Sequence, residues 1–211
     1  MRNAGELASV AGQSFYKLMG SGRGLGFNAW PDWSVYVLFQ VWEKEDDALR
    51  FFDQHPFFET YRQKSEEYWT VHMQCVQAVG NWDGQNPLKT VQSNDSDGPF
   101  AVLTRATIKW GKMFKFWSYV TRAQRPLKGI DQLIFTKGVG EVPIRNMATF
   151  SLWESKEDML SYAYGTKAHQ GAISRTKKYD WYEEELFARF VPYKSLGTWK
   201  GEELLKIFEA S

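Results

Sequence analysis

FQVWEKEDDAL, residues 39–49, has a counterpart 111 residues further along the chain, FSLWESKEDML, residues 150–160. Later, GNWDG (residues 80–84) returns as GTWKG (residues 197–201) with an offset of 117, so six extra residues entered the second copy between the two matches. A repeat of this length indicates a duplicated subdomain whose copies bury their apolar faces against each other. We therefore expect the functional site in the space that the two copies enclose.

The second copy shows the complete pattern of elements. Apolar residues at every second position predict strands, and helical spacing with capping and proline signals predicts helices. The expected order is a strand over 100–109, a helix over 113–123, strands over 131–137 and 145–153, a helix from Ser155 to Tyr164, a further helix over 166–179 and a strand over 184–191. Gly138 to Glu141 is expected to turn the second strand into the third. This β-α-β-β-α-β order is that of the ferredoxin-like unit.

The first copy follows the same order from its second strand onward. Its expected elements are a strand over 14–19, a glycine-rich turn over 21–33, a strand over 35–42, a helical part over 45–61 and a strand over 68–78. The predicted fold is α+β, with two tandem ferredoxin-like (βαββαβ) repeats. The first repeat spans residues 1–85, a polar linker spans 86–99 and the second repeat spans 100–211. We expect two sheets that pack face to face and together form one α+β barrel domain, with its lumen as the pocket.

The first repeat is predicted to lack its first strand. Residues 1–13 can supply a short helix, over Ala4 to Ala11, but not a strand as well. The first strand of a ferredoxin-like sheet lies between two others, so its absence would leave unpaired backbone groups and an exposed apolar edge. Either the natural protein begins upstream of Met1 or another chain fills the gap.

Composition narrows the classes of function. Aromatic residues make up 17% of the 211 residues, enough to line an apolar cavity or simply to fill a core. The net charge of +1, with acidic and basic residues interspersed, argues against a nucleic-acid partner. The single cysteine, Cys75, excludes an internal disulfide and favours the cytoplasm. No stretch has the length of a membrane-spanning helix, so membrane contact would be peripheral.

The glycine-rich segment Gly20 to Gly26 could cradle a phosphate through its backbone N–H groups. However, it lacks the Lys-Ser/Thr pair of a P-loop, and Pro31 and Asp32 lead into a strand rather than a helix. A turn that needs positive φ is the competing interpretation.

Three histidines limit the metal chemistry, namely His55, His72 and His169. His169 stands where the first copy has Phe58, and it follows a helix interruption at Gly165. No second ligand stands at suitable spacing near it, which disfavours a non-haem metal site, whereas a haem needs a single protein ligand. A hydrogen-bonded structural or surface role is the alternative.

Arg105 is expected to share a strand face with Leu103 and Thr107, opposite the face that the helices cover. It could therefore point into the lumen and hold an anionic ligand group such as a haem propionate. The alternative is an ion pair with a glutamate such as Glu184 or Glu185. The acidic run 183–185 alternates faces on a strand, which favours a solvated edge over paired catalytic carboxylates.

Several motifs extend in order over nearly the whole chain: FYKLMGSG (15–22), PDW (31–33), LTRATI (103–108), FW (116–117), GVGEVP (138–143), ATFSLW (148–153), HQGAI (169–173) and EELFARF (184–190). Together they resemble the spheroidene monooxygenase family of carotenoid ketolases. The chain is also similar to the wider group of haem-binding dimeric α+β barrels.

This resemblance implies a haem-dependent monooxygenase that inserts oxygen at the end of an acyclic carotenoid, with O2 and reduced ferredoxin as cosubstrates. It implies that His169 is the axial ligand of the haem iron. With the residue patterns above, it suggests Arg105, Trp117 and Phe150 as cofactor-binding residues and Phe39 and Phe116 as further apolar walls. Because the implied substrate is apolar, a peripheral contact with the membrane is also possible. The resemblance to dimeric barrels makes an oligomer possible as well. The catalytic residues are not assigned.

Two other hypotheses stay open. The chain could be a carrier of haem or of an apolar ligand that has the same barrel but no turnover. It could also be a scaffold without haem. The sequence shows no acid–base pair that separates these hypotheses from the enzyme.

Overall fold

The computed structural model describes residues 4–24, 30–92, 98–123, 129–142, 144–165 and 179–205, with the backbone alone for 119–123. The elements are α1 (Ala4–Leu7), β1 (Gln13–Gly22), β2 (Pro31–Trp42), α2 (Glu45–Gln54), α3 (Pro56–Lys64), β3 (Trp69–Gly80), β4 (Phe100–Ile108), a 3-10 turn η1 (Trp110–Lys112), α4 (Met113–Ala123), β5 (Leu133–Val142), β6 (Asn146–Trp153), α5 (Lys156–Gly165) and β7 (Tyr182–Gly197). The predicted mixture of helices and strands is therefore confirmed.

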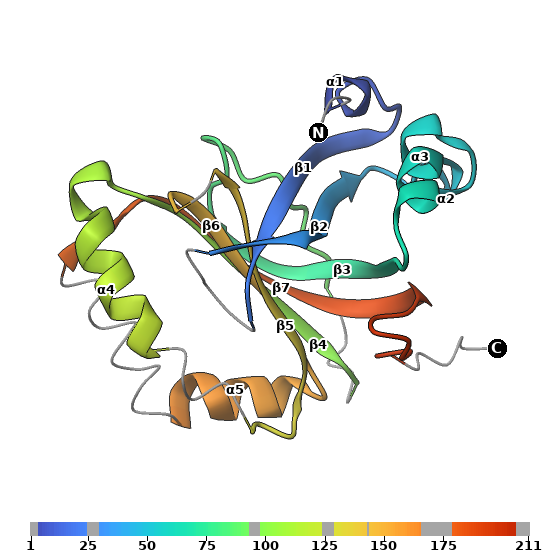
Figure 1. Cartoon of the computed structure of the whole chain (residues 1–211). Coiled ribbons are helices and arrows are strands. Elements are labelled where there is room, and N and C mark those ends of the chain that lie inside the picture. The colour runs from blue at the N-terminus through green and yellow to red at the C-terminus, as the bar shows by residue number, and fades with distance from the viewer. Residues whose placement is uncertain are drawn as a thin grey trace.

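The seven strands form one curled sheet in the order β2-β1-β5-β6-β4-β7-β3, and every pairing is antiparallel (Figure 1). The expectation of two separate sheets is wrong, because strands of the two halves pair directly. β3 pairs with β7 along its whole length, whereas β1 pairs with β5 only at Gly20–Gly140 and Ser21–Val139. The second half keeps β4 between β6 and β7, with β5 beyond β6.

β2 and β3 are the two outer strands of this sheet, and each pairs with one neighbour. In the described part of the chain, α1 and a short turn precede β1, and the helix ends at Leu7 rather than at the expected Ala11. The described residues from Ala4 onward therefore contribute no strand ahead of β1.

The glycines at 138 and 140 lie inside β5, so the turn expected at 138–141 is wrong. A Cβ atom at Gly140 would lie 2.7 Å from the carbonyl oxygen of Asn146, so glycine is needed there for close approach of two strands. In the first half, β1 and β2 likewise run into the predicted turn over 21–33, and Ser21 pairs with Asp32. Gly24 has a φ of +82°, in agreement with the turn interpretation.

Proline and capping side chains set the helix ends. The single helical part expected over 45–61 is two helices, because Pro56 cannot continue α2 and instead begins α3. His55 lies at the break, and its Nδ1 accepts a hydrogen bond from the Phe57 N–H at 3.2 Å. At α5, Ser155 Oγ accepts the Asp158 N–H at 3.1 Å, as the capping pattern predicted.

The inner face of the curled sheet carries the main core. Its buried members are Phe15, Met19, Cys75, Trp82, Ala101, Leu103, Val139, Ala148, Leu152, Leu186, Ala188, Phe190 and Leu205. On the outer face, α1, α2 and α3 pack on the β1–β2 end through Leu7, Phe51 and Phe57. Elsewhere on that face, α4 contributes Phe116 and α5 contributes Met159 to separate clusters (Figure 1). The helices thus leave the inner face to the strands and turns.

The repeated turns take the same conformation. A bridge joins Trp82 to Gln85 in the first, and Trp199 to Glu202 in the second. Each turn begins at a glycine with positive φ, Gly80 at +96° and Gly197 at +82°. The two matching sequence segments therefore share their local geometry.

Gly80→Ala is expected to destabilise the fold by more than about 3 kcal/mol. The left-handed conformation alone costs a side chain about 1–2 kcal/mol, and a Cβ atom here would also overlap the carbonyl oxygen of Glu185 on β7. Gly84→Ala is the matched control, because φ there is +80° and a Cβ atom meets nothing within 4 Å. Urea unfolding of both variants measures the difference, and equal losses would contradict the close approach.

Candidate functional site

A pocket of about 460 Å³ opens beside β1. Its lining residues are Ala8, Gln13, Ser14, Phe15, Tyr16, Lys17, Leu18, Asp83 and Gln85. It lies where β1 and β5 separate, since these strands pair only at the Gly20–Gly140 end. Pockets for small ligands commonly have volumes of about 300–1,000 Å³. The candidate site is therefore a split in the sheet, whereas the sequence suggested the space enclosed by the two repeats.

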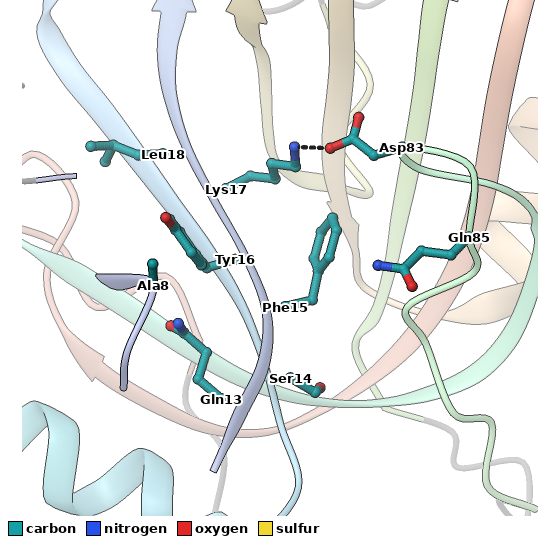
Figure 2. Close-up of a pocket in the computed structure, with 9 residues that line it drawn as sticks. All are labelled: Ala8, Gln13, Ser14, Phe15, Tyr16, Lys17, Leu18, Asp83 and Gln85. Atoms are coloured by element: carbon teal, nitrogen blue, oxygen red, sulfur yellow. Dashed lines mark hydrogen bonds and ion pairs between the residues drawn. The ribbon is translucent and has the colours of Figure 1, made fainter. Parts of the chain in front are cut away.

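Alternation along β1 decides which side chains face this split. Figure 2 shows Phe15 and Lys17 on the side of β1 where Asp83 and Gln85 lie. Tyr16 and Leu18 point to the other side, toward the helical layer. The site thus combines one apolar ring with a charged group from β1 and polar groups from the turn after β3.

Lys17 holds two carboxylates at the end of the pocket. Its Nζ forms ion pairs with Asp83 and, at 2.7 Å, with Glu141 of β5. Burial acts to lower the pKa of Lys17, but the hydrogen bonds to Asp83 and Glu141 outweigh it and hold that pKa above its ordinary value. Lys17 is therefore a fixed positive charge at neutral pH, whereas the Asp83 side chain is half exposed.

Trp82 connects this charged group to the core. Its Nε1 donates a hydrogen bond to Glu141 at 2.7 Å, and its ring stacks on Phe39 with 5.5 Å between centroids. The guanidinium of Arg105 lies over the same tryptophan, 5.5 Å from the ring centre. Lys17 and Arg105, which are distant in sequence, thus both lie beside the turn at residues 80–84.

Arg105 faces the inner side of the sheet, as predicted, with 2% of its side chain exposed. It is ion-paired with Glu184 of β7, and its Nη2 lies 3.7 Å from Asp83. Glu184 is thus the partner that the ion-pair alternative proposed. Burial acts to raise the pKa of Glu184, but hydrogen bonds from Gly84, Arg105 and Asp83 lower it overall.

The two halves cap each other's repeated turn. Glu184 of the second half accepts the Gly84 N–H at 2.6 Å and the Asp83 N–H at 3.1 Å. Its repeat counterpart 117 residues earlier, Glu67, accepts the Lys200 and Gly201 N–H groups, both at 2.6 Å. The halves differ in the turn itself, where Asp83 of the pocket corresponds to Lys200.

The other residues proposed from sequence occupy three different places. Phe150 lies half-buried on the inner core, next to Phe135. Trp117 lies on the outer face, where its Nε1 donates to the Ile144 carbonyl at 2.9 Å, so the sheet separates it from Phe150. Phe116 packs beside it, whereas Phe39 lies on the inner core. His169 lies outside the described residues.

His55 and His72 are the histidines within the described residues, and neither is placed to ligate a haem in the pocket. His55 Nδ1 is occupied in capping α3. His72 is buried with no hydrogen-bond partner for Nε2 within the described residues, but its ring lies between Phe52 and Tyr193 on the outer side. Burial lowers the pKa of His72, which keeps the imidazole neutral. Neither histidine lines the pocket, so the described residues supply no histidine ligand for a haem there.

Sequence reasoning missed the group formed by Lys17, Asp83 and Glu141. Two signals were present: Lys17 alternates with Phe15 and Met19 on an otherwise apolar face, and Asp83 differs in charge from its counterpart Lys200. Neither signal shows that a turn after β3 reaches β1 and β5. No set of three potential metal ligands lies together among the described side chains.

Fold and site together define an α+β protein with a single curled sheet and a charged, aromatic pocket in a split of that sheet. No family model matches the chain. Spheroidene monooxygenase from Rhodobacter capsulatus is 36% identical over 193 residues, a match that covers 90% of this chain and 80% of the relative. The chain belongs to the spheroidene monooxygenase family.

The Cereibacter sphaeroides spheroidene monooxygenase is 35% identical over 190 residues, and the match spans 59% of its length. Among solved structures, a proposed monooxygenase from Fusobacterium nucleatum is 14% identical, with a TM-score of 0.45 and coverage of 92% of this chain and 82% of that one. A TM-score below 0.5 says nothing about shared chemistry.

Glu184→Gln is expected to lower the free energy of unfolding at pH 7 by about 3 kcal/mol, because it leaves the buried Arg105 without its carboxylate. The folded-state pKa of Glu184 lies below the ordinary 4.5, so its contribution is present above pH 4.5 and disappears as the pH falls through that lowered pKa. The loss should therefore shrink in acid, as measured by urea unfolding at pH 7 and pH 3.

Glu67→Gln is the control for this prediction. It removes the cap of the sister turn without leaving a buried cation, so it should cost less than Glu184→Gln. If both variants lose the same stability at both pH values, the Arg105 pair is not what Glu184 stabilises.

Proposed function

We propose that this chain carries the oxygenase site of an enzyme that introduces a hydroxyl or keto group into an acyclic carotenoid such as spheroidene. The observation that carries the proposal is the 36% identity to spheroidene monooxygenase over 90% of the chain. Identity spread over the whole chain supports a shared reaction better than a shared fold does, since one fold can host many reactions.

In the hydroxylation step, one atom of O2 enters a C–H bond of the substrate and the other leaves as water. The step consumes two electrons, for which we propose reduced ferredoxin as the source, and two protons. A second hydroxylation at the same carbon, followed by loss of water, yields the ketone. The site must therefore bind an apolar chain, admit O2 and accept protons and electrons.

The pocket has groups suited to part of this task. Phe15 and Leu18 supply apolar surface, and the volume of about 460 Å³ suits one end of a long polyene rather than the whole molecule. Lys17 is positively charged but already pairs with Asp83 and Glu141, so it would stabilise negative charge on reduced oxygen only by sharing its N–H groups with these carboxylates. Asp83, half exposed and in contact with Lys17, is placed to exchange protons with water.

We propose haem as the cofactor that activates O2, with His169 as its axial ligand and Arg105 as the partner of a propionate. Of the two aromatic contacts expected from sequence, Phe150 lies on the same inner face as Arg105, whereas Trp117 lies on the outer face and does not share a haem site with them. Haem supplies the one-electron chemistry of O2 that amino-acid side chains lack. Arg105 already neutralises Glu184, so a propionate at Arg105 would have to share the guanidinium with that carboxylate.

A peripheral membrane contact fits the same proposal, because a carotenoid dissolves in bilayers. Trp110 and Phe114 are 69% and 91% exposed at the start of the α4 region. Lys109, Lys112 and Lys115 alternate with them. Exposed aromatic side chains among lysines are typical of segments that lie in the interface of an anionic membrane. None of the helices in the described ranges has the length and apolarity to cross a bilayer.

The enzyme hypothesis predicts a Soret band from the purified chain with haem, which shifts with CO after reduction. It also predicts a product that carries one ¹⁸O atom when the chain receives ¹⁸O2, reduced ferredoxin and spheroidene. His169→Ala should abolish the band and the product without unfolding the chain, since the sister position holds Phe58. His72→Ala, away from the pocket, should keep both.

Each of the other outcomes contradicts one part of this hypothesis. A normal Soret band in His169→Ala together with its loss in His72→Ala would overturn the ligand assignment. A haem-bound chain that forms no product would be a carrier. A chain that shows no band at all would be a scaffold without haem.

The double variant Trp110→Ser, Phe114→Ser should bind vesicles of phosphatidylglycerol at least ~10-fold more weakly than the parent chain, because it removes the apolar anchors of the patch. Vesicle flotation measures the binding. Trp30→Ser is the control, since Trp30 is 73% exposed but lies at the start of the β2 segment. Equal binding of all three proteins would refute this contact.

A further inference from the structure

The two outer strands of the sheet are repeat counterparts of two inner strands. β2 corresponds to β6 through the 111-residue offset, and β3 corresponds to β7 through the 117-residue offset. In the second half, β4 lies between β6 and β7 and pairs antiparallel with both. In the described part of the first half, nothing occupies the corresponding position between β2 and β3.

Burial differs between the halves where this added strand and its helix would lie. Met147 of β6 is 6% exposed, whereas its counterpart Tyr36 on β2 is 45% exposed. Leu152 is fully buried, whereas its counterpart Val41 is only partly buried. In the second half, Phe116 of α4 packs with Met147 in the outer cluster. Tyr36 thus marks the surface that a helix equivalent to α4 would cover.

The charged residues beside the gap also favour an added strand. In the second half, Arg105 of β4 forms its ion pair with Glu184. Glu67, the counterpart of Glu184, is exposed and accepts hydrogen bonds from the turn at 198–201, with no ion pair in the described residues. A cation at the position equivalent to Arg105 on an added strand would meet Glu67.

We propose that the gap between β2 and β3 is a binding site for one polypeptide segment with the chemistry of Phe100–Ala123. The segment is a β-strand with alternating apolar residues and one inward basic residue, followed by an amphipathic helix. The outer edges of β2 and β3, which pair with no further strand among the described residues, would supply its hydrogen bonds as in β-strand addition. At β3 the edge extends only to the residues before Cys75, whose carbonyl accepts the Val91 N–H at 2.9 Å. Each residue of β6 and β7 that pairs with β4 has a counterpart 111 or 117 positions earlier in the chain. These counterparts predict that the segment pairs with Val35–Trp42 of β2 and with residues 67–73 at β3.

A peptide with the sequence of residues 100–123, attached to a soluble carrier, is the probe. Hydrogen exchange of the full chain, followed by mass spectrometry, should slow at least ~10-fold at residues 35–42 and 69–73 when the peptide is added. A peptide with Leu103→Pro lacks one backbone N–H group that would donate to a neighbouring strand. A peptide with Arg105→Glu places a second carboxylate next to Glu67, and the two repel each other. Both peptides should give no more than a tenth of this protection.

Two variants of the chain locate the contact. Tyr36→Glu should weaken binding of the peptide at least ~10-fold, because it places a charge where the helix packs. Tyr164→Glu, at an exposed aromatic residue on α5, should not. Circular dichroism of both variants confirms that the chain is folded.

The proposal is overturned if the parent peptide protects neither edge, or if the Leu103→Pro peptide protects both equally. It is also overturned if residues 35–42 become protected without peptide as the concentration of the chain rises. That result would show β2 edges of two copies pairing with each other, which sedimentation velocity would detect as a dimer.

Discussion

The buried guanidinium of Arg105 is the group on which the centre of this structure depends. An unpaired charge in a core is costly, so Arg105 requires a carboxylate, and Glu184 supplies it from the neighbouring strand. The same carboxylate accepts two backbone N–H groups of the turn at 83–84. One ion pair therefore joins β4 and β7 of the second half to a turn of the first half and places Asp83 beside Lys17.

Duplication makes that arrangement possible because each half supplies the cap that the other half's turn lacks. Glu67 and Glu184 occupy equivalent positions and act on opposite turns. Where the copies diverge, the structure becomes polar and open: Asp83 replaces a lysine, and β1 separates from β5 to leave the pocket. Asp83, which differs from its counterpart Lys200, thus lies in the candidate site, whereas Glu67 and Glu184, which are alike, cap the turns.

Much of the fold was predictable because it depends on local patterns. Alternation predicted that Arg105 and Leu103 share a face, and capping side chains located the start of α5. The errors arose where a neighbouring strand decides the outcome. Glycine is common in turns, so the pattern predicts a turn at Gly138 and Gly140. In the structure, Gly140 instead allows β5 and β6 to approach closely. Likewise, side chains of Trp117 and Phe150, both aromatic, lie on opposite faces of the sheet.

By itself, the sequence determined the matching segments at offsets of 111 and 117 residues, the α+β class and the inward face of β4. These follow from spacing along one chain, which is a local property. Only the tertiary structure decided that the halves share one sheet, that Glu184 rather than Glu185 pairs with Arg105, and that Lys17, Asp83 and Glu141 meet. Such contacts depend on which strand edges pair, and edge pairing is set by the whole sheet rather than by any one segment.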